Sequence, residues 1–232
     1  MHVLAIDTSA TAVGAAIADE QGLIAQLELV HGRQASETLL PLVNSLLTLS
    51  GLSLSALDTL AVTIGPGSFT GLRIGLATVK AWTQALDKPL VAVSTLQALA
   101  YGAQEHGALV CPILNAQRGE LYAALFAEGR RMLDDTLITP PALAALLLAY
   151  NSPIIFCGEG LAEAAGQLAT LLQERMLIAP PQRQAFMAGA TALIGRDKYL
   201  AGETVDPVLL EPAYLRLAAA EEQQAKGIIQ HG

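Results

Sequence analysis

One stretch decides the fold of this chain: Ala61-Val62-Thr63-Ile64-Gly65-Pro66-Gly67-Ser68-Phe69-Thr70-Gly71-Leu72-Arg73-Ile74-Gly75. It begins as an apolar strand and continues, after a tight turn, as a helix with almost no charge. Gly65 and Gly67 give the turn access to positive φ, and Pro66 between them has a fixed φ. Ser68 or Thr70 can cap the helix that follows. The stretch therefore predicts a strand–turn–helix unit of an α/β protein.

Two glycines inside that helix, Gly71 and Gly75, lie four residues apart and share one face. Each costs about 1 kcal/mol of helix propensity relative to alanine, so a neighbouring group is expected to approach this face closely. That group is either the chain's own sheet or a partner. The stretch is not a complete phosphate-binding motif, because the Lys of a P-loop is missing and Thr70 stands where a dinucleotide fingerprint needs glycine.

The composition restricts the class of protein. Apolar residues make up 53% of the 232 residues, charged residues make up 15%, and the net charge is −8. Because basic surface supplies most nucleic-acid affinity, we expect the chain alone to bind nucleic acid poorly. Cys111 and Cys157 lie in apolar runs and are expected to be buried thiols rather than a disulfide or a metal pair.

The sequence shows no sign of a membrane segment. Residues 1–7 have no basic region of the kind that begins a signal peptide, and they include an early Asp7. The longest wholly apolar run, Ala142–Ala149, is far too short to span a bilayer. We therefore expect a cytoplasmic protein with no membrane partner.

Hydrophobic periodicity and turn residues predict two successive α/β units. In the first, strands are expected at His2–Ile6, Ala12–Ala18, Leu23–Val30, Leu60–Ile64 and Leu90–Val93, and helices at Gln34–Leu49, Thr70–Ala85 and Leu96–Glu105. In the second, strands are expected at Leu109–Leu114, Leu121–Ala127 and Ile154–Cys157, and helices at Pro141–Tyr150, Leu161–Leu172 and Gln184–Leu200. This order predicts an actin-like, ribonuclease H-like α/β fold of two lobes, with mixed sheets flanked by helices and a reduced second lobe. We place the first lobe at residues 1–106, the second at 107–217 and a frayed tail at 218–232.

The first two helices carry more apolar surface than one sheet face needs. A helix lying on a sheet requires an apolar stripe of about 100°, whereas the apolar residues of these helices cover about 180° or more. Either the two halves of the chain cover each other, or the excess forms an interface with a partner. We predict the interface, made by Leu39, Leu42, Leu46, Leu49, Leu72, Arg73, Gly75, Leu76, Val79 and Trp82.

Four blocks of sequence, in order along the chain, resemble the bacterial TsaB family. They are Ala5-Ile6-Asp7-Thr8-Ser9, residues 65–75, Gln117-Arg118-Gly119-Glu120-Leu121-Tyr122 and Glu211-Pro212-Ala213-Tyr214-Leu215-Arg216. The block at 65–75 is the most specific, and the resemblance runs from the first strand to about Arg216. It implies an actin-like, Hsp70-like fold of two lobes.

The resemblance also implies a function and partners. TsaB is the non-catalytic partner of the TsaD subunit, which transfers a threonylcarbamoyl group to the adenosine next to the anticodon of tRNA. It implies a heterodimer with TsaD through the first-lobe helices, further association with the TsaE ATPase, and a homodimer when the partner is absent. Binding of tRNA is then expected only through the complex.

The residues of a working actin-type active site are incomplete. The helix Gln34–Leu49 has no histidine, whereas TsaD relatives carry a metal-binding His-x-x-x-His there. The first hairpin, Asp7-Thr8-Ser9-Ala10, lacks the glycine that lets a backbone approach phosphate, and Asn115 stands where kinases often carry a carboxylate. We therefore predict a degenerate nucleotide cleft at Asp7, Thr8, Ser9 and Asn115, with no catalytic residue, metal or cofactor.

Two enzymatic functions are the alternatives to a non-catalytic subunit. An actin-fold ATP-dependent small-molecule kinase with a degenerate phosphate hairpin remains the alternative, and it would bind Mg-ATP and turn over alone. A peptidase is disfavoured, because the chain has no Gly-x-Ser-x-Gly elbow and no His-Glu-x-x-His, and neither cysteine has a base beside it in sequence.

Overall fold

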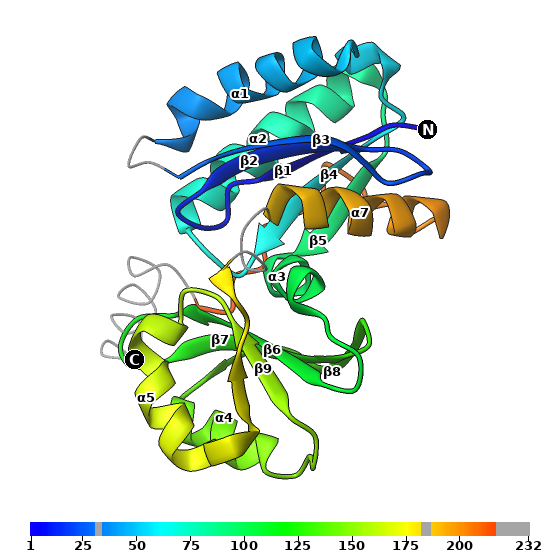
Figure 1. Cartoon of the computed structure of the whole chain (residues 1–232). Helices are drawn as coiled ribbons and strands as arrows, with labels where there is room; N and C mark the ends of the chain where they lie inside the picture. The colour runs from blue at the N-terminus through cyan, green and yellow to red at the C-terminus, as the bar shows by residue number, and fades with distance from the viewer. Residues whose placement is uncertain (31–33, 182–186, 217–232) are drawn as a thin grey trace, which may run out of the picture.

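Two five-stranded sheets, each with its own helices, form two lobes in the computed structural model, which describes residues 1–30, 34–181 and 187–216 (Figure 1). The first sheet has the strand order β3-β2-β1-β4-β5. Its strands are β1 (Val3–Asp7), β2 (Val13–Ala18), β3 (Leu23–Leu29), β4 (Thr59–Gly65) and β5 (Leu90–Ser94). β1, β2 and β3 pair antiparallel as a meander, and β4 and β5 continue parallel to β1.

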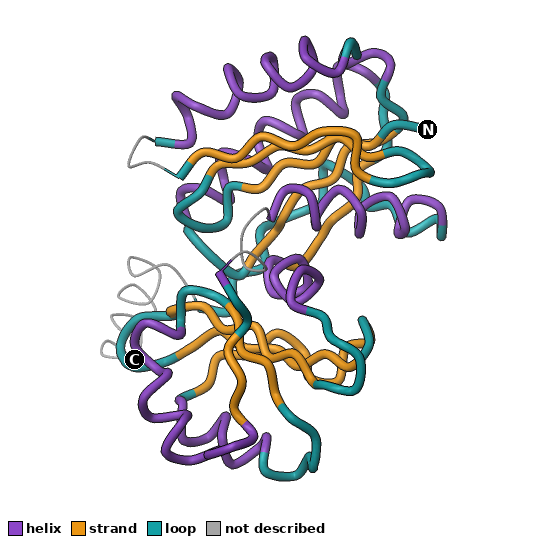
Figure 2. Tube along the Cα trace, in the orientation of Figure 1, coloured by secondary structure: helices purple, strands orange, loops and turns teal. Residues whose placement is uncertain are grey.

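Helices cover both faces of the first sheet. α1 (Ala35–Ser50) and α2 (Phe69–Leu86) pack on one face, and α3 (Thr95–Ala103) and α7 (Met187–Leu200) on the other (Figures 1 and 2). Alternate residues of β1 show why: Leu4 and Ile6 join the core beneath α1 and α2, whereas Val3 and Ala5 join the core beneath α7. A 3-10 turn, η1 (Leu54–Ala56), lies between α1 and β4.

The second sheet repeats the arrangement of the first in smaller form, with the order β10-β9-β6-β7-β8. Its elements are β6 (Leu109–Asn115), β7 (Leu121–Ala127), β8 (Arg130–Ile138), α4 (Pro140–Leu147), β9 (Ile154–Cys157), α5 (Leu161–Leu172), η2 (Gln173–Arg175) and β10 (Met176–Ile178). One face packs against α4 and α5. The other packs against α3, which therefore lies between the two sheets (Figure 1).

The structure confirms the predicted two-lobed actin-like fold, and most predicted elements end within two residues of the observed ones. Two strands, β8 and β10, were not predicted. For the predicted helix at 184–200, the described part begins at Met187, and residues 182–186 lie outside the described residues. Both cysteines are free and buried, as expected.

The predicted boundary at residues 106/107 is wrong for the end of the chain. α7 packs against all five strands of the first sheet, although we assigned it to the second lobe. The segment after α7 also returns to the first lobe, where the backbone N–H of Ala213 donates to the carbonyl of Ile64 at 2.7 Å. The predicted tail at 218–232 lies outside the described residues.

No helix within the described ranges has both the length and the hydrophobicity that crossing a membrane requires.

Candidate functional site

The glycine turn positions the start of α2 at the junction of the lobes. Gly65 has φ +121°, a conformation that favours glycine, at the end of β4. Ser68 caps α2, because its side chain accepts a hydrogen bond from the backbone N–H of Gly71 at 3.2 Å. Of the two caps that the sequence allowed, the structure has Ser68.

The glycine face of α2 is occupied by the first hairpin of the same chain. A Cβ added to Gly71 would lie closer than 3.0 Å to the carbonyl oxygen of Thr8, and one added to Gly75 would lie equally close to Thr8 Oγ1. That hydroxyl donates to the carbonyl of Gly71 at 2.8 Å. The two glycines therefore allow Thr8 to pack against the helix, which settles the question left open by the sequence: their close neighbour is the chain's own hairpin.

Asp7 is fully buried at the end of β1. Its Oδ1 accepts hydrogen bonds from the hydroxyls of Ser9 and Thr63, both at 2.6 Å, and from the backbone N–H of Ser9 at 3.2 Å. Oδ2 has no hydrogen-bond partner among the described residues. Burial raises the pKa of this carboxyl group, and the hydrogen bonds from Ser9 and Thr63 oppose the rise. These contacts tie β1, the hairpin turn and β4 together.

A polar cleft of about 730 Å³ lies between the lobes. Ser9, Gly67 and Ser68 line it from the first lobe, and Asn115 and Arg118 from the second. Of the predicted cleft residues, the structure thus brings Ser9 and Asn115 to one cavity, whereas Asp7 and Thr8 are buried behind it.

The hairpin between β6 and β7 forms the second-lobe wall of this cleft. Asn115 Oδ1 accepts from the backbone N–H of Gln117 at 2.7 Å, and its Nδ2 donates to Glu163 at 2.5 Å. Gln117 and Arg118 both have positive φ, +64° and +57°. Arg216 closes the wall by donating to the carbonyl of Ala116 and to Glu120. Asn115 is therefore already engaged in holding its own turn.

Among the residues with described positions, no group of three or more histidine, cysteine, aspartate or glutamate side chains could hold a metal ion. The described residues of the cleft provide hydroxyl, amide and guanidinium groups and the carboxylate of Glu159. These groups can bind a polar molecule, and the hydroxyl of Ser9 in the wall already donates its hydrogen bond to the buried Asp7.

Most of the predicted interface residues are wrongly placed. Seven of the ten are buried in the chain's own core and cannot meet a partner in this structure: Leu39, Leu42, Leu46, Leu72, Gly75, Leu76 and Val79. The physical reason is that α1 and α2 share one sheet face and pack against each other, so each uses a wider arc than a single helix on a sheet. The other three are accessible: Leu49 is 76% exposed, Arg73 is exposed and Trp82 is half-buried.

The outer surface of α1 and α2 carries residues that the sequence reasoning missed. Leu40 is 54% exposed, and Ala77, Ala81 and Ala85 form an exposed row of small side chains at every fourth position of α2. The segment after α7 lies beside α2, because the side chain of Lys80 donates a hydrogen bond to the carbonyl of Val208. On this segment Val208 is 82% exposed and Leu209 is 76% exposed. We call these residues, with Leu49 and Trp82, the outer helical surface. The spacing of the alanines was available in the sequence, but only the structure shows that they face outward.

Comparison with known proteins identifies the family. The family model described as TsaD, tRNA N6-adenosine threonylcarbamoyltransferase, matches residues 29–223. The tRNA threonylcarbamoyladenosine biosynthesis protein TsaB of Bacillus subtilis is 31% identical over 225 residues, which cover 95% of this chain and 96% of the relative. The chain belongs to the TsaB family. The TsaB protein of Haemophilus influenzae is 28% identical over 93% of this chain and 94% of the relative.

Solved structures agree with this membership. YeaZ from Pseudomonas aeruginosa superposes with a TM-score of 0.73 at 27% identity, covering 92% of this chain and 99% of that one. The ROK hexokinase from Thermus thermophilus has a TM-score of 0.51 at 12% identity, over 83% of this chain and 97% of that one. The second likeness shows the fold alone: this chain shares its overall architecture with the hexokinase.

Proposed function

We propose that this TsaB-family chain is a non-catalytic subunit that works with a TsaD-type subunit in making threonylcarbamoyladenosine on tRNA. It activates or positions the catalytic subunit by binding it, and a TsaE-type ATPase joins the assembly. tRNA is bound through the complex, consistent with the net charge of −8. In the absence of the partner, two copies of the chain pair through the surface that would otherwise bind the TsaD-type subunit. The site of these reactions is the cytoplasm.

The observation that carries the proposal is the closed glycine face of α2. Thr8 and Ser9 pack their backbone against Gly67 and Gly71 so closely that a Cβ at either glycine would overlap a carbonyl oxygen. In a working phosphate site, backbone of this kind has to leave room for the ligand's oxygens. Here the space directly against the two glycines is filled by the chain's own hairpin, and only the polar cleft beside Ser9, Gly67 and Ser68 stays open. The closed glycine face supports a role in binding a protein rather than in phosphoryl chemistry.

The outer helical surface supplies the proposed interface. Exposed Leu40 and Leu49 on opposite sides of α1, a row of alanines on α2 and the exposed Val208 and Leu209 supply its apolar side chains, and the exposed Asn44, Ser45 and Thr48 of α1 supply polar ones. The alanines allow a partner helix to approach closely, and the flanking larger side chains can then fill the space beside it.

The test is a variant at the centre of this surface. Ala81→Arg places a long charged side chain on an exposed helix position, so it should leave the fold intact and prevent association. Size-exclusion chromatography with light scattering would be run on the chain alone and mixed with its TsaD-type subunit. We expect a one-to-one complex for the unmodified chain and separate species for Ala81→Arg.

A matched control uses an exposed apolar residue elsewhere. Leu146 on α4 is 45% exposed on the second lobe, and Leu146→Arg should bind the TsaD-type subunit like the unmodified chain. Normal complex formation by Ala81→Arg, with circular dichroism showing an unchanged fold, would refute the interface.

A further inference from the structure

A second cavity, of about 370 Å³, lies beside the polar cleft and has a different chemistry. The two share part of their walls, at Ala10, Thr11, Leu114 and Glu159. The walls of this second cavity are mostly apolar, and its described lining includes two carboxylates and no basic side chain. Its volume lies in the range of sites that bind small molecules, about 300 to 1,000 Å³.

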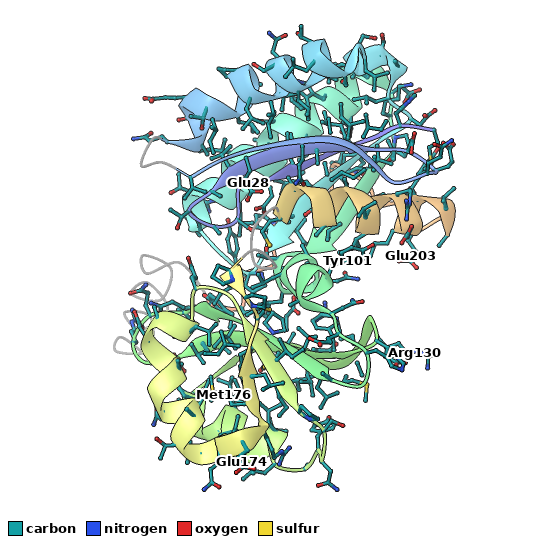
Figure 3. The ribbon with its side chains drawn as sticks, viewed as in Figure 1. Glu28, Tyr101, Arg130, Glu174, Met176 and Glu203 are labelled. Atoms are coloured by element: carbon teal, nitrogen blue, oxygen red, sulfur yellow. The ribbon has the colours of Figure 1, made fainter. Side chains whose placement is uncertain are left out.

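Residues from both lobes line this cavity. Glu28 on β3 and Met187 at the start of α7 belong to the first lobe, and Glu28 lies beside α7 in Figure 3. Leu114 at the end of β6 and Glu159 in the turn before α5 belong to the second. A molecule bound here would therefore contact both lobes at once.

Two polar groups in the wall lack hydrogen-bond partners. Glu28 accepts a hydrogen bond from the backbone N–H of Met187, but its Oε2 has no partner among the described residues. Thr95, at the start of α3, is fully buried, and its Oγ1 is equally unpartnered there. Because burying polar atoms without partners costs free energy, each of these atoms is a place where a ligand can add a hydrogen bond.

Among the described residues, no basic side chain compensates the negative charge around Glu28. Asp7, Gly14 and Glu28 face one another across β1, β2 and β3 in register, so both carboxylates lie on the same face of the sheet. Asp7 Oδ2 also lacks a partner among the described residues. Asp7 is buried and Glu28 is half-buried, and carboxylates removed from water are normally paired with a cation. The described residues around this pair provide only hydroxyl and backbone donors.

We propose that this cavity binds a small organic cation, an ammonium or amidinium group on an apolar body, which pairs with Glu28 and contacts both lobes. Leu99, Leu114 and Met187 enclose the apolar body, and the cation supplies the donor that Glu28 Oε2 lacks. The last torsion of a glutamate side chain is soft, so Oε2 can rotate to meet the cation. Anions are excluded by the two carboxylates in the wall.

Binding should strengthen with pH. Burial, together with the nearby charge of Asp7, raises the pKa of Glu28 to about 7, and the hydrogen bond from the Met187 N–H opposes the rise. The charged groups around it are Asp7 on β1 and Glu159 across the cavity. A cation prefers the ionised carboxylate, so the affinity should rise about tenfold between pH 6 and pH 8.

The experiment uses the four methionines of the chain as reporters. With methyl-13C methionine, the full-length chain is titrated with benzamidine, with the neutral isostere benzamide and with the anion benzoate. We expect benzamidine to move the Met187 methyl signal saturably and to leave Met132 and Met176 unchanged, the latter lying on the second lobe in Figure 3. Benzamide should bind at least tenfold more weakly, and benzoate should not bind.

Variants test the role of the carboxylate. Glu28→Gln should weaken benzamidine binding at least tenfold, and the exposed Glu37→Gln on α1 should have no effect. The signals of the other three methionines report whether each variant is folded. If Glu28→Gln does not fold, the comparison of benzamidine with benzamide on the unmodified chain still shows whether the cavity selects a cation. Equal binding of both probes, binding unaffected by Glu28→Gln, or an unmoved Met187 signal would each overturn the proposal.

Discussion

Gly75→Ala should destabilise the first lobe even though alanine is the better helix former. On helix propensity alone, the substitution gains about 1 kcal/mol. The added methyl, however, would lie closer than 3.0 Å to Thr8 Oγ1, and that hydroxyl is fixed by its hydrogen bond to the carbonyl of Gly71. Overpacking costs about 1 to 3 kcal/mol and the lost hydrogen bond about 1 kcal/mol. We expect a net loss of about 2 kcal/mol.

A second substitution should reverse this loss. In Thr8→Ala the hydroxyl is absent, and the nearest remaining atom of Thr8, its Cβ, lies at an ordinary contact distance of 3.5 Å from the added methyl. Gly75→Ala should therefore be neutral or stabilising by up to about 1 kcal/mol in the Thr8→Ala background. Gly71→Ala meets the carbonyl oxygen of Thr8 instead, so Thr8→Ala should not rescue it.

The assay is urea unfolding followed by tryptophan fluorescence. The single tryptophan, Trp82, lies on α2 itself and reports on the first lobe. Gly166→Ala on α5 is the control, because a Cβ there meets nothing within 4 Å, and it should be neutral or stabilising. The reasoning fails if Gly75→Ala is as stable as the unmodified chain, or if Thr8→Ala rescues both glycine variants equally.

Two further predictions concern the carboxylates of Glu28 and Asp7. Glu28 has a pKa of about 7 in the folded chain against an ordinary value of 4.5 in the unfolded chain, so its ionisation destabilises the fold progressively as the pH rises from about 4.5 to above 7. In thermal melting, Glu28→Gln should therefore be as stable as the unmodified chain at pH 5. At pH 8 its free energy of unfolding should be larger by about 1 to 2 kcal/mol after screening by solvent. The same difference in stability at both pH values would contradict this prediction. Asp7→Ala removes the acceptor of the Ser9 and Thr63 hydroxyls and should cost about 1 to 3 kcal/mol in urea unfolding, while tRNA modification at 25 °C with the partner persists. Complete loss of modification by a folded Asp7→Ala chain would instead indicate an active role for the cleft.

The sequence allowed the fold to be predicted because its signals are local. The glycine turn, the alternating apolar strands and the helix period each depend on neighbouring residues, and they identified most elements. β8 was missed because it is an edge strand with charged residues at its start and in its middle, such as Arg130 and Asp135. β10 has only three residues and was too short to recognise. The return of α7 to the first sheet could not be predicted, because nothing in a helix sequence specifies which sheet it covers.

The site was harder to predict than the fold. An apolar arc shows how much of a helix is buried, but it does not distinguish burial against the chain's own sheet from burial against a partner. The sequence therefore predicts an interface on the faces of α1 and α2 that the structure shows to be buried. It does not single out the alanines of α2 that the structure shows to be exposed. The contact between Thr8 and Gly71 joins residues 63 positions apart, so the reason for the glycines emerged only from the structure.

A reconstituted modification assay decides whether this chain acts by binding its partner through the outer helical surface. Formation of threonylcarbamoyladenosine on tRNA would be measured with the TsaD-type and TsaE-type subunits, the threonylcarbamoyl donor and one of three chains: unmodified, Ala81→Arg or the double variant Ser9→Ala/Asn115→Ala. The account predicts that Ala81→Arg loses activity and that the cleft variant keeps it. Full activity with Ala81→Arg, or loss of activity with a folded cleft variant that still binds its partner, would contradict it.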